Sequence, residues 1–198
     1  MSIKFTLLGA GSSMGVPHAN GFFGKCDPKN IKNFRTRCSA LISTNYSNTL
    51  IDTSPDLRTQ SLAQNIKQID RVLYTHMHAD QTHGINDLRI FYLKNKKKIP
   101  VYADKRTIAY LQKNFSYCFK KEYDYPPMLS VRLLKKNFII NDGNNKIKIS
   151  SIPVKHGQID SIAFIVNNKL AYVSDANKFY DKDIKYFKKL KYLVIDCL

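Results

Sequence analysis

The apolar residues of this chain fall into short runs of strand length, separated by polar or glycine-rich segments. Ile3–Gly9 alternates apolar and polar residues and predicts a first strand. Arg37–Ser43 and Asn48–Thr53 predict an antiparallel pair joined near residues 45–47. The same pattern predicts further strands at Arg71–Tyr74, Ile99–Tyr102, Leu129–Leu134, Phe138–Ile140, Ile147–Val154, Ile162–Val166, Leu170–Val173 and Tyr192–Ile195. Asn167-Asn168 predicts a tight hairpin, because asparagine tolerates positive φ.

Helical segments alternate with these strands. Pro55 to about Asn65 predicts a helix with Ser54 as its N-cap, since proline suits the first helical position. Asn86–Leu93, Lys105–Phe115 and a short segment near Asp183–Leu190 predict three more. Helices that flank many strands are typical of a layered α+β domain. No linker or low-complexity stretch divides the 198 residues, so we expect a single domain over residues 1–198.

Candidate chemistry is concentrated in residues 75–84, Thr-His-Met-His-Ala-Asp-Gln-Thr-His-Gly. This run directly follows the predicted strand Arg71–Tyr74 and holds three of the five histidines of the chain. Imidazole and carboxylate groups at a strand end can converge on one point, and both are ligands that zinc and similar ions prefer. A histidine pair alone is a weak signal. With Asp80 and Gly84 added, we interpret the segment as one that descends from a metal site.

Two further segments place a ligand-type residue directly after a predicted strand. His156 follows Ile147–Val154, and Asp175 follows Leu170–Val173. A single histidine after a strand is more often structural. Together with His76 and His78, however, these residues supply three imidazoles and one carboxylate, which is enough to bind one metal ion.

These motifs resemble those of metallo-β-lactamase-fold hydrolases, in the branch of the phosphoribosyl cyclic phosphate phosphodiesterases, which is related to the tRNA 3′-processing nucleases. The resemblance covers essentially the whole chain. It rests on residues 9–17, Ile51-Asp52-Thr53-Ser54-Pro55-Asp56-Leu57-Arg58, the histidine run at 75–84, Asn86-Asp87-Leu88-Arg89, Val154-Lys155-His156-Gly157 and Tyr172-Val173-Ser174-Asp175. It implies a four-layer αββα sandwich with metal at one edge between the two sheets.

The resemblance also implies roles for individual residues. His76, His78 and His156 match the ligands of a first metal, and Asp175 matches the carboxylate that bridges two metals. Asp80 matches a ligand of the second metal and is the candidate catalytic residue. Similar proteins use a metal-held hydroxide to attack phosphorus, and the expected cofactor is zinc or manganese.

The chain departs from the family pattern at two places. Gln81 stands where the motif has its last histidine, and His83, two residues on, is a candidate substitute. Similar proteins continue beyond the last predicted strand with a loop that bears another histidine and with a further helix, so we expect the chain to be C-terminally incomplete. Each departure removes a ligand of the second site. We therefore expect one ion rather than two, and weak or absent turnover.

Three other residues are candidates of lower rank. Asp52 either supports the metal ligands from behind or simply packs in the core. Ser12 and Ser13, in the glycine-rich turn after the first strand, either line a substrate pocket or only form the turn. That turn lacks the Lys-Ser/Thr ending of a P-loop and the full dinucleotide spacing.

The composition limits the partners. The formal net charge is +17, carried mainly by lysine in clusters such as residues 94–98. This charge either attracts an anionic partner or reflects a general drift of the composition toward lysine, with solvated faces, and the second interpretation is favoured. A positive field would still help to capture an anionic substrate, and the small phosphoester that we expect is implied by the family resemblance. A nucleic-acid partner is less favoured, because no interleaved basic and aromatic recognition module is present.

Other features of the composition bear on location and redox state. The apolar runs are too short for a membrane span, so we expect a cytoplasmic protein. No Cys-x-x-Cys pair occurs among the cysteines at 26, 38, 118 and 197, and free, mostly buried thiols are expected.

Two main interpretations of function follow. The first is a metal-dependent phosphodiesterase-like hydrolase with an impaired second site. The second is an inactive truncated relative or binding module. A tRNA-processing nuclease is a further alternative.

Overall fold

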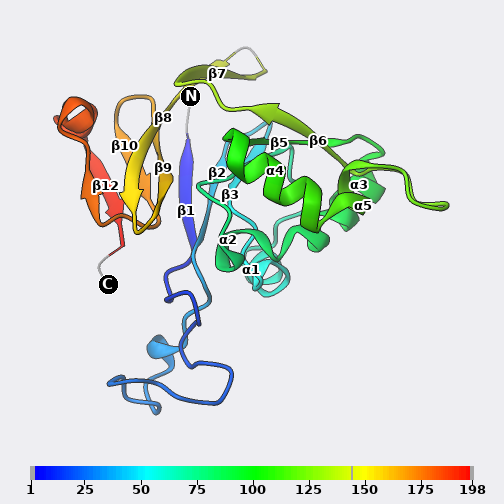
Figure 1. Cartoon of the computed structure of the whole chain (residues 1–198). Helices are drawn as coiled ribbons and strands as arrows, with labels where there is room; N and C mark the ends of the chain where they lie inside the picture. Colours follow the sequence, from blue (N-terminus) through cyan, green and yellow to red (C-terminus); the bar gives the residue numbers. More distant parts are fainter. Residues whose placement is uncertain (1–2, 144, 197–198) are drawn as a thin grey trace.

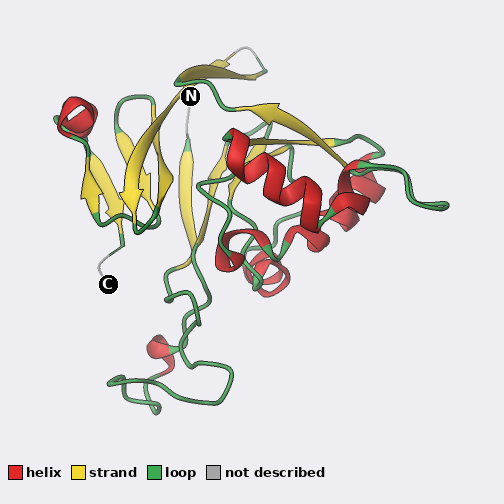
Figure 2. Ribbon diagram, in the orientation of Figure 1, coloured by secondary structure: helices red, strands yellow, loops and turns green. Residues whose placement is uncertain are grey.

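The computed structural model describes residues 3–143 and 145–196. Two β-sheets pack face to face, with helices on the outer side of each (Figure 1). This is the four-layer α+β sandwich expected from the sequence. Figure 2 shows that most helices cover one sheet, while a single helical segment accompanies the other. No helix in the described ranges combines the length and apolarity needed to cross a membrane.

The first sheet has the order β1-β2-β3-β4-β5-β6. Its first three strands are antiparallel, and β3 to β6 run parallel to one another. The parallel strands are linked by helices, as parallel pairing requires. The strands are β1 (Lys4–Gly9), β2 (Ser39–Ser43), β3 (Asn48–Ile51), β4 (Arg71–Leu73), β5 (Ile99–Ala103) and β6 (Leu129–Leu133).

The second sheet has the order β11-β8-β9-β10-β12, and β7 also pairs with β8. All of its pairings are antiparallel except that of β10 with β12. The predicted hairpin between β9 and β10 is confirmed, since Asn167 and Asn168 have φ of 49° and 54°. The strands are β7 (Asn137–Asp142), β8 (Asn145–His156), β9 (Ile159–Val166), β10 (Leu170–Val173), β11 (Lys178–Phe179) and β12 (Tyr192–Ile195).

The helices cover the sheets through apolar faces. In α4, the N-cap Asp104 accepts a hydrogen bond from the Thr107 backbone at 2.7 Å, and Leu111 is buried against the first sheet. The helices on this side are α1 (Leu57–Ala63), α2 (Ala79–Thr82), η2 (Ile85–Asp87), α3 (Leu88–Asn95), α4 (Lys105–Asn114) and α5 (Ser116–Phe119). A short 3₁₀ turn, η1 (Ile31–Asn33), lies in the loop between β1 and β2.

Two helical predictions need correction. The first helix begins at Leu57 rather than at Pro55, because the Ser54 hydroxyl accepts from the Asp56 backbone and the Asp56 carboxylate binds Arg37. The last predicted helix is the 3₁₀ segment η3 (Asp181–Phe187). The short helices α2 and α5 were not predicted, since four residues are too few to establish a helical period.

Three apolar clusters correspond to the layers. The central one joins the two sheets, with Ile42 and Ile51 from the first sheet packed with Ile149 and Phe164 from the second. A second cluster lies between the first sheet and its helices, and a third lies between the second sheet and η3. The two sheets therefore share one interior, and their strand ends meet along a common edge.

Candidate metal centre

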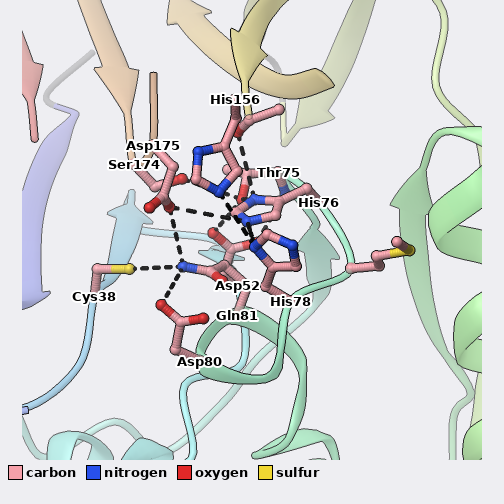
Figure 3. A network of polar contacts seen from close by, with 12 residues as sticks. Cys38, Asp52, Thr75, His76, His78, Asp80, Gln81, His156, Ser174 and Asp175 are labelled. Atoms are coloured by element: carbon pink, nitrogen blue, oxygen red, sulfur yellow. Dashed lines mark hydrogen bonds and ion pairs between the residues drawn. The ribbon is translucent and has the colours of Figure 1, made fainter. Parts of the chain in front are cut away.

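The predicted ligand residues lie at the ends of strands from both sheets. His76 and His78 follow β4 of the first sheet, His156 ends β8, and Asp175 comes two residues after β10 of the second sheet. A backbone hydrogen bond of 2.9 Å from Ile162 to the Thr75 carbonyl joins the sheets at this point. The side chains consequently meet at the edge between the sheets (Figure 3).

Three imidazole rings converge on one point. His78 Nδ1 lies 3.0 Å from His76 Nε2 and 3.2 Å from His156 Nε2. One ligand atom from each of the three histidines lies within 4.8 Å of the others. His76 is buried, His156 is half-buried and His78 is exposed, so the cluster is open to solvent on one side.

The tautomer of His76 follows from its neighbours. The Thr75 hydroxyl donates to Asp52 Oδ2 at 2.8 Å, so its oxygen is free to accept from His76 Nδ1, 3.1 Å away. The Ser174 hydroxyl donates to the same Thr75 oxygen at 3.2 Å. With the proton on Nδ1, the lone pair of Nε2 faces the other two rings. This is the orientation that a metal-binding imidazole requires.

Burial favours the neutral form of His76 and His78. Desolvation, with smaller contributions from His78 and His156, lowers the pKa of His76 to about 3. Desolvation and the neighbouring His156 also lower the pKa of His78. Neutral imidazole is the form that binds metal ions.

The donor set matches a divalent ion. Ligands of a tetrahedral zinc ion, with Zn–N bonds of about 2.0–2.1 Å, lie roughly 3.3 Å apart. The two nitrogen–nitrogen distances at His78, 3.0 and 3.2 Å, are close to this value. His76, His78 and His156 are therefore the residues that would hold the metal.

A carboxylate pair lies beside the imidazoles. Asp175 Oδ2 is 4.0 Å from His76 Nε2, and burial followed by the Asp80 charge raises the pKa of Asp175 to about 6. The Gln81 amide nitrogen lies between the two carboxylates, 3.0 Å from Asp80 Oδ2 and 3.1 Å from Asp175 Oδ2. It also donates to Cys38 Sγ at 3.0 Å. Gln81, which stands where the family motif has its last histidine, thus links both carboxylates.

Of the remaining candidates, Asp52 contacts the imidazole cluster through Thr75, and His83 lies outside it. Asp52 is fully buried and accepts bonds from both the backbone and the hydroxyl of Thr75, so it supports His76 from behind. Burial raises the pKa of Asp52 well above its usual range. His83 is exposed and lies outside the imidazole cluster, with Nε2 3.1 Å from the Tyr110 hydroxyl and its ring packed on Phe115. His83 therefore does not take the place of the ligand missing at position 81.

A cavity of about 310 Å³ opens next to the carboxylates. Ser12 and Ser13 line it together with the rest of the glycine-rich turn and with Asp80, Asp175 and Asp196. Burial raises the pKa of Asp196. The volume of the cavity is at the lower end of the range for small-molecule sites.

Sequence reasoning missed two residues of this region. Asp196 follows β12 as Asp175 follows β10, so the same signal of an acidic residue after a strand was present. Cys38 carried no such signal, because it precedes its strand and has no partner in sequence. Cys26 is exposed and Cys118 is buried, and both are free thiols, while Cys197 lies outside the described residues.

Comparison with known proteins agrees with this geometry. Residues 47–198 match the family described as the beta-lactamase superfamily domain. A curated relative, an octanoyltransferase of Porphyromonas gingivalis (strain ATCC BAA-308 / W83), is 29% identical over 198 residues, which cover 99% of this chain and 39% of the relative. The chain thus spans about two fifths of the length of that relative.

Solved structures share the fold. A diphosphatase from the PhnP family is 28% identical, with a TM-score of 0.82, over 98% of this chain and 72% of its own. Zinc-bound PqqB from Methylobacterium extorquens (17% identity, TM-score 0.72) covers 98% of this chain and 70% of its own. The short form of human tRNase Z (15%, 0.65) covers 97% of this chain and 76% of its own. With the family match covering most of the chain, the protein belongs to the β-lactamase superfamily and has the metallo-β-lactamase hydrolase fold.

Proposed function

We propose that this chain is a metal-dependent hydrolase of small anionic phosphoesters, with one divalent ion held by His76, His78 and His156. The observation that carries the proposal is the convergence of three imidazoles beside a carboxylate-lined cavity. The likeness to the PhnP-family diphosphatase supports phosphorus chemistry. The octanoyltransferase name belongs to a much longer relative, and the chain's own residues form a β-lactamase superfamily domain.

Each residue of the site has a separate task in this proposal. The three histidines hold the ion, zinc or manganese, and Asp175 lies beside them. When bound, the ion supplies a Lewis acid for a phosphoryl oxygen and lowers the pKa of water to about 7. Asp80 lines the cavity and is the group that we assign to receive a proton from the attacking water.

The cavity supports a small substrate. The turn at Ser12 and Ser13 lines the same cavity as the carboxylates, and both serines can donate hydrogen bonds to a phosphate oxygen. A cavity of about 310 Å³ accommodates a small phosphoester rather than a folded nucleic acid. The net charge of +17 increases the local concentration of anions.

The Gln81 amide favours a second candidate, a chain that binds phosphoesters without turning them over. A neutral amide lies between Asp80 and Asp175, where similar proteins have a ligand for a second metal. Replacing imidazole by an amide weakens that second position, and catalysis that needs two ions would be lost.

Hydrolysis of bis-p-nitrophenyl phosphate tests the proposal. We expect metal-free protein to be inactive, zinc or manganese to restore activity, and His78→Ala to reduce the restored rate at least 100-fold. His83→Ala is the matched control, because His83 lies in the same segment but outside the cluster. Equal rates in His78→Ala and the unchanged chain would refute the proposal. Activity that appears only in Gln81→His would instead establish the candidate without turnover.

A further inference from the structure

A groove of about 680 Å³ lies between α1 and α3, in the helical layer that covers the first sheet on the side facing away from the second sheet (Figure 1). Its volume is more than twice that of the cavity beside the carboxylates. Among the described residues, none lines both hollows. The α1–α3 groove is therefore separate from the candidate metal centre.

The α1–α3 groove is apolar inside and at its upper edges. Ile66 and Phe91 line it and belong to the buried core beneath the helices. Leu62 on α1 and Ile90 and Leu93 on α3 also line it, and they are 67%, 64% and 39% exposed. Exposed aliphatic side chains that occur singly are ordinary, but a group of them on two neighbouring helices marks an interaction surface.

The apolar surface continues across α3. Arg89 and Leu93 also line a second hollow, of about 380 Å³, together with three tyrosines and one methionine: Tyr92, Tyr117, Tyr125 and Met128. The Arg89 guanidinium lies 4.7 Å from the centre of the Tyr125 ring. Tyrosine, methionine and arginine are the residues that protein–protein interfaces favour over the rest of the surface. This composition indicates a protein as the occupant.

The rim of the α1–α3 groove is basic. It carries four exposed cationic side chains that form no ion pair within the described residues: Arg58, Lys67, Arg89 and Lys94. Asp87 is the only acidic side chain among the described residues that line the groove. Lys94 also begins the lysine-rich run at residues 94–98, so that run adjoins the groove. Positive charge around an apolar floor is complementary to an acidic, amphipathic partner.

We propose that the α1–α3 groove binds an acidic amphipathic helix of a partner protein. Such a helix presents apolar side chains at i, i+3, i+4 and i+7, and these contact Leu62, Ile90 and Leu93. Its acidic side chains lie beside the apolar stripe and pair with the cations of the rim. A second copy of this chain is a poorer occupant, because a symmetric pair would bring two basic rims together.

Fluorescence anisotropy with a labelled, designed peptide tests the proposal. The probe has about 18 residues, with leucine on one helical face and glutamate at the flanking positions. We expect saturable one-to-one binding that weakens as salt is added. A peptide of the same composition in shuffled order should bind at least tenfold more weakly, because it has no continuous apolar face.

Ile90→Asp tests the apolar part of the α1–α3 groove and should weaken binding at least tenfold. Ile139→Asp is the matched control, because Ile139 is similarly exposed, 52% against 64%, but lies on β7 of the second sheet. Both variants should keep the urea midpoint of the unchanged chain, since neither side chain is buried. Equal affinities of the two variants for the peptide would overturn the proposal.

Charge reversal separates the rim from the overall charge. Arg58→Glu combined with Arg89→Glu should weaken binding at least tenfold. Lys182→Glu combined with Lys185→Glu changes the net charge by the same amount on η3 of the second sheet, and it should change binding less than threefold. Equal losses in the two double variants would show that the net charge of +17 alone attracts the peptide, and would overturn the proposal.

Other occupants give different results. Binding of the shuffled peptide with the same affinity as the probe would contradict a helical ligand. A dimer in sedimentation equilibrium that Ile90→Asp dissociates would assign the groove to a second copy of this chain. Binding to phosphatidylserine vesicles that Ile90→Asp abolishes would assign it to a membrane surface. Each of these three results would overturn the proposal.

Discussion

Thr75→Val tests how the buried network positions the metal ligands. The Thr75 hydroxyl is the only atom of its side chain that links Asp52, His76 and Ser174, with contacts of 2.8, 3.1 and 3.2 Å. Valine has nearly the same shape and removes only the hydroxyl. Asp52, which is fully buried, keeps the backbone bond from residue 75 and loses the side-chain bond.

The expected cost has two parts. Removing the hydroxyl leaves a buried oxygen of Asp52 without its partner, which costs about 1–3 kcal/mol, so Thr75→Val should lower the free energy of unfolding by roughly this amount. His76 also loses the partner that fixes its tautomer, which typically weakens metal binding about 10–100-fold. Thr75→Ser keeps the hydroxyl and should change stability by less, about 1 kcal/mol, for the lost methyl group.

Urea denaturation of metal-free protein and zinc titration against a chelating indicator measure the two parts separately. The reasoning predicts a clear order, with the valine variant weaker than the serine variant in both assays. If both variants bind zinc with the same affinity, the hydroxyl does not orient His76. If both have the same urea midpoint, the bond to Asp52 contributes nothing.

Two further predictions concern stability. Arg37 holds Asp56 through three bonds, at 2.8 Å from its backbone and at 2.9 and 2.6 Å from its guanidinium, and lowers the pKa of Asp56. Because the folded pKa of Asp56 is below its unfolded value, the pair stabilises the fold above pH ~4, and this contribution is lost as the pH falls further. Asp56→Asn should therefore lower the free energy of unfolding by about 1 kcal/mol at pH 7, a value reduced because the pair is partly exposed. Urea midpoints of the two proteins that stay equally far apart at pH 3 would contradict this. A Cβ at Gly84 would lie 1.9 Å from the Ser54 carbonyl oxygen, so Gly84→Ala should lower the melting temperature strongly. Gly157→Ala is the control and should lower it far less, because its φ of +55° costs only about 1 kcal/mol and nothing lies within 4 Å of the added Cβ. Similar melting temperatures for the two variants would show that the backbone at Ser54 moves easily to make room.

The sequence predicted the strands and the residues at their ends better than it predicted the contacts among them. His76, His156 and Asp175 each follow an apolar run. Such a run predicts the strand and also the position at which the strand ends. The imidazole cluster was predicted from that signal together with the family resemblance. The fold class, a two-sheet sandwich with outer helices, was confirmed.

Contacts between distant segments could not be predicted in the same way. Cys38 meets Gln81 across 43 positions of the chain, and no local pattern records such a contact. His83 carried the same ligand chemistry as His78, but its position at the end of α2 turns it toward Tyr110. The direction of a side chain at the end of a helix of four residues depends on tertiary packing rather than on spacing.

The division of the histidines between the two sheets has a consequence for folding. His76 and His78 belong to the half of the chain that ends with β6, while His156 belongs to the later half. An ion bound by all three, as proposed, would cross-link two parts of the chain that are otherwise joined mainly by apolar side chains. Either part alone has an incomplete set of metal ligands, so tight metal binding would require that the two sheets are packed together. Removing the ion with a chelator would therefore weaken the packing between the sheets before either sheet unfolds.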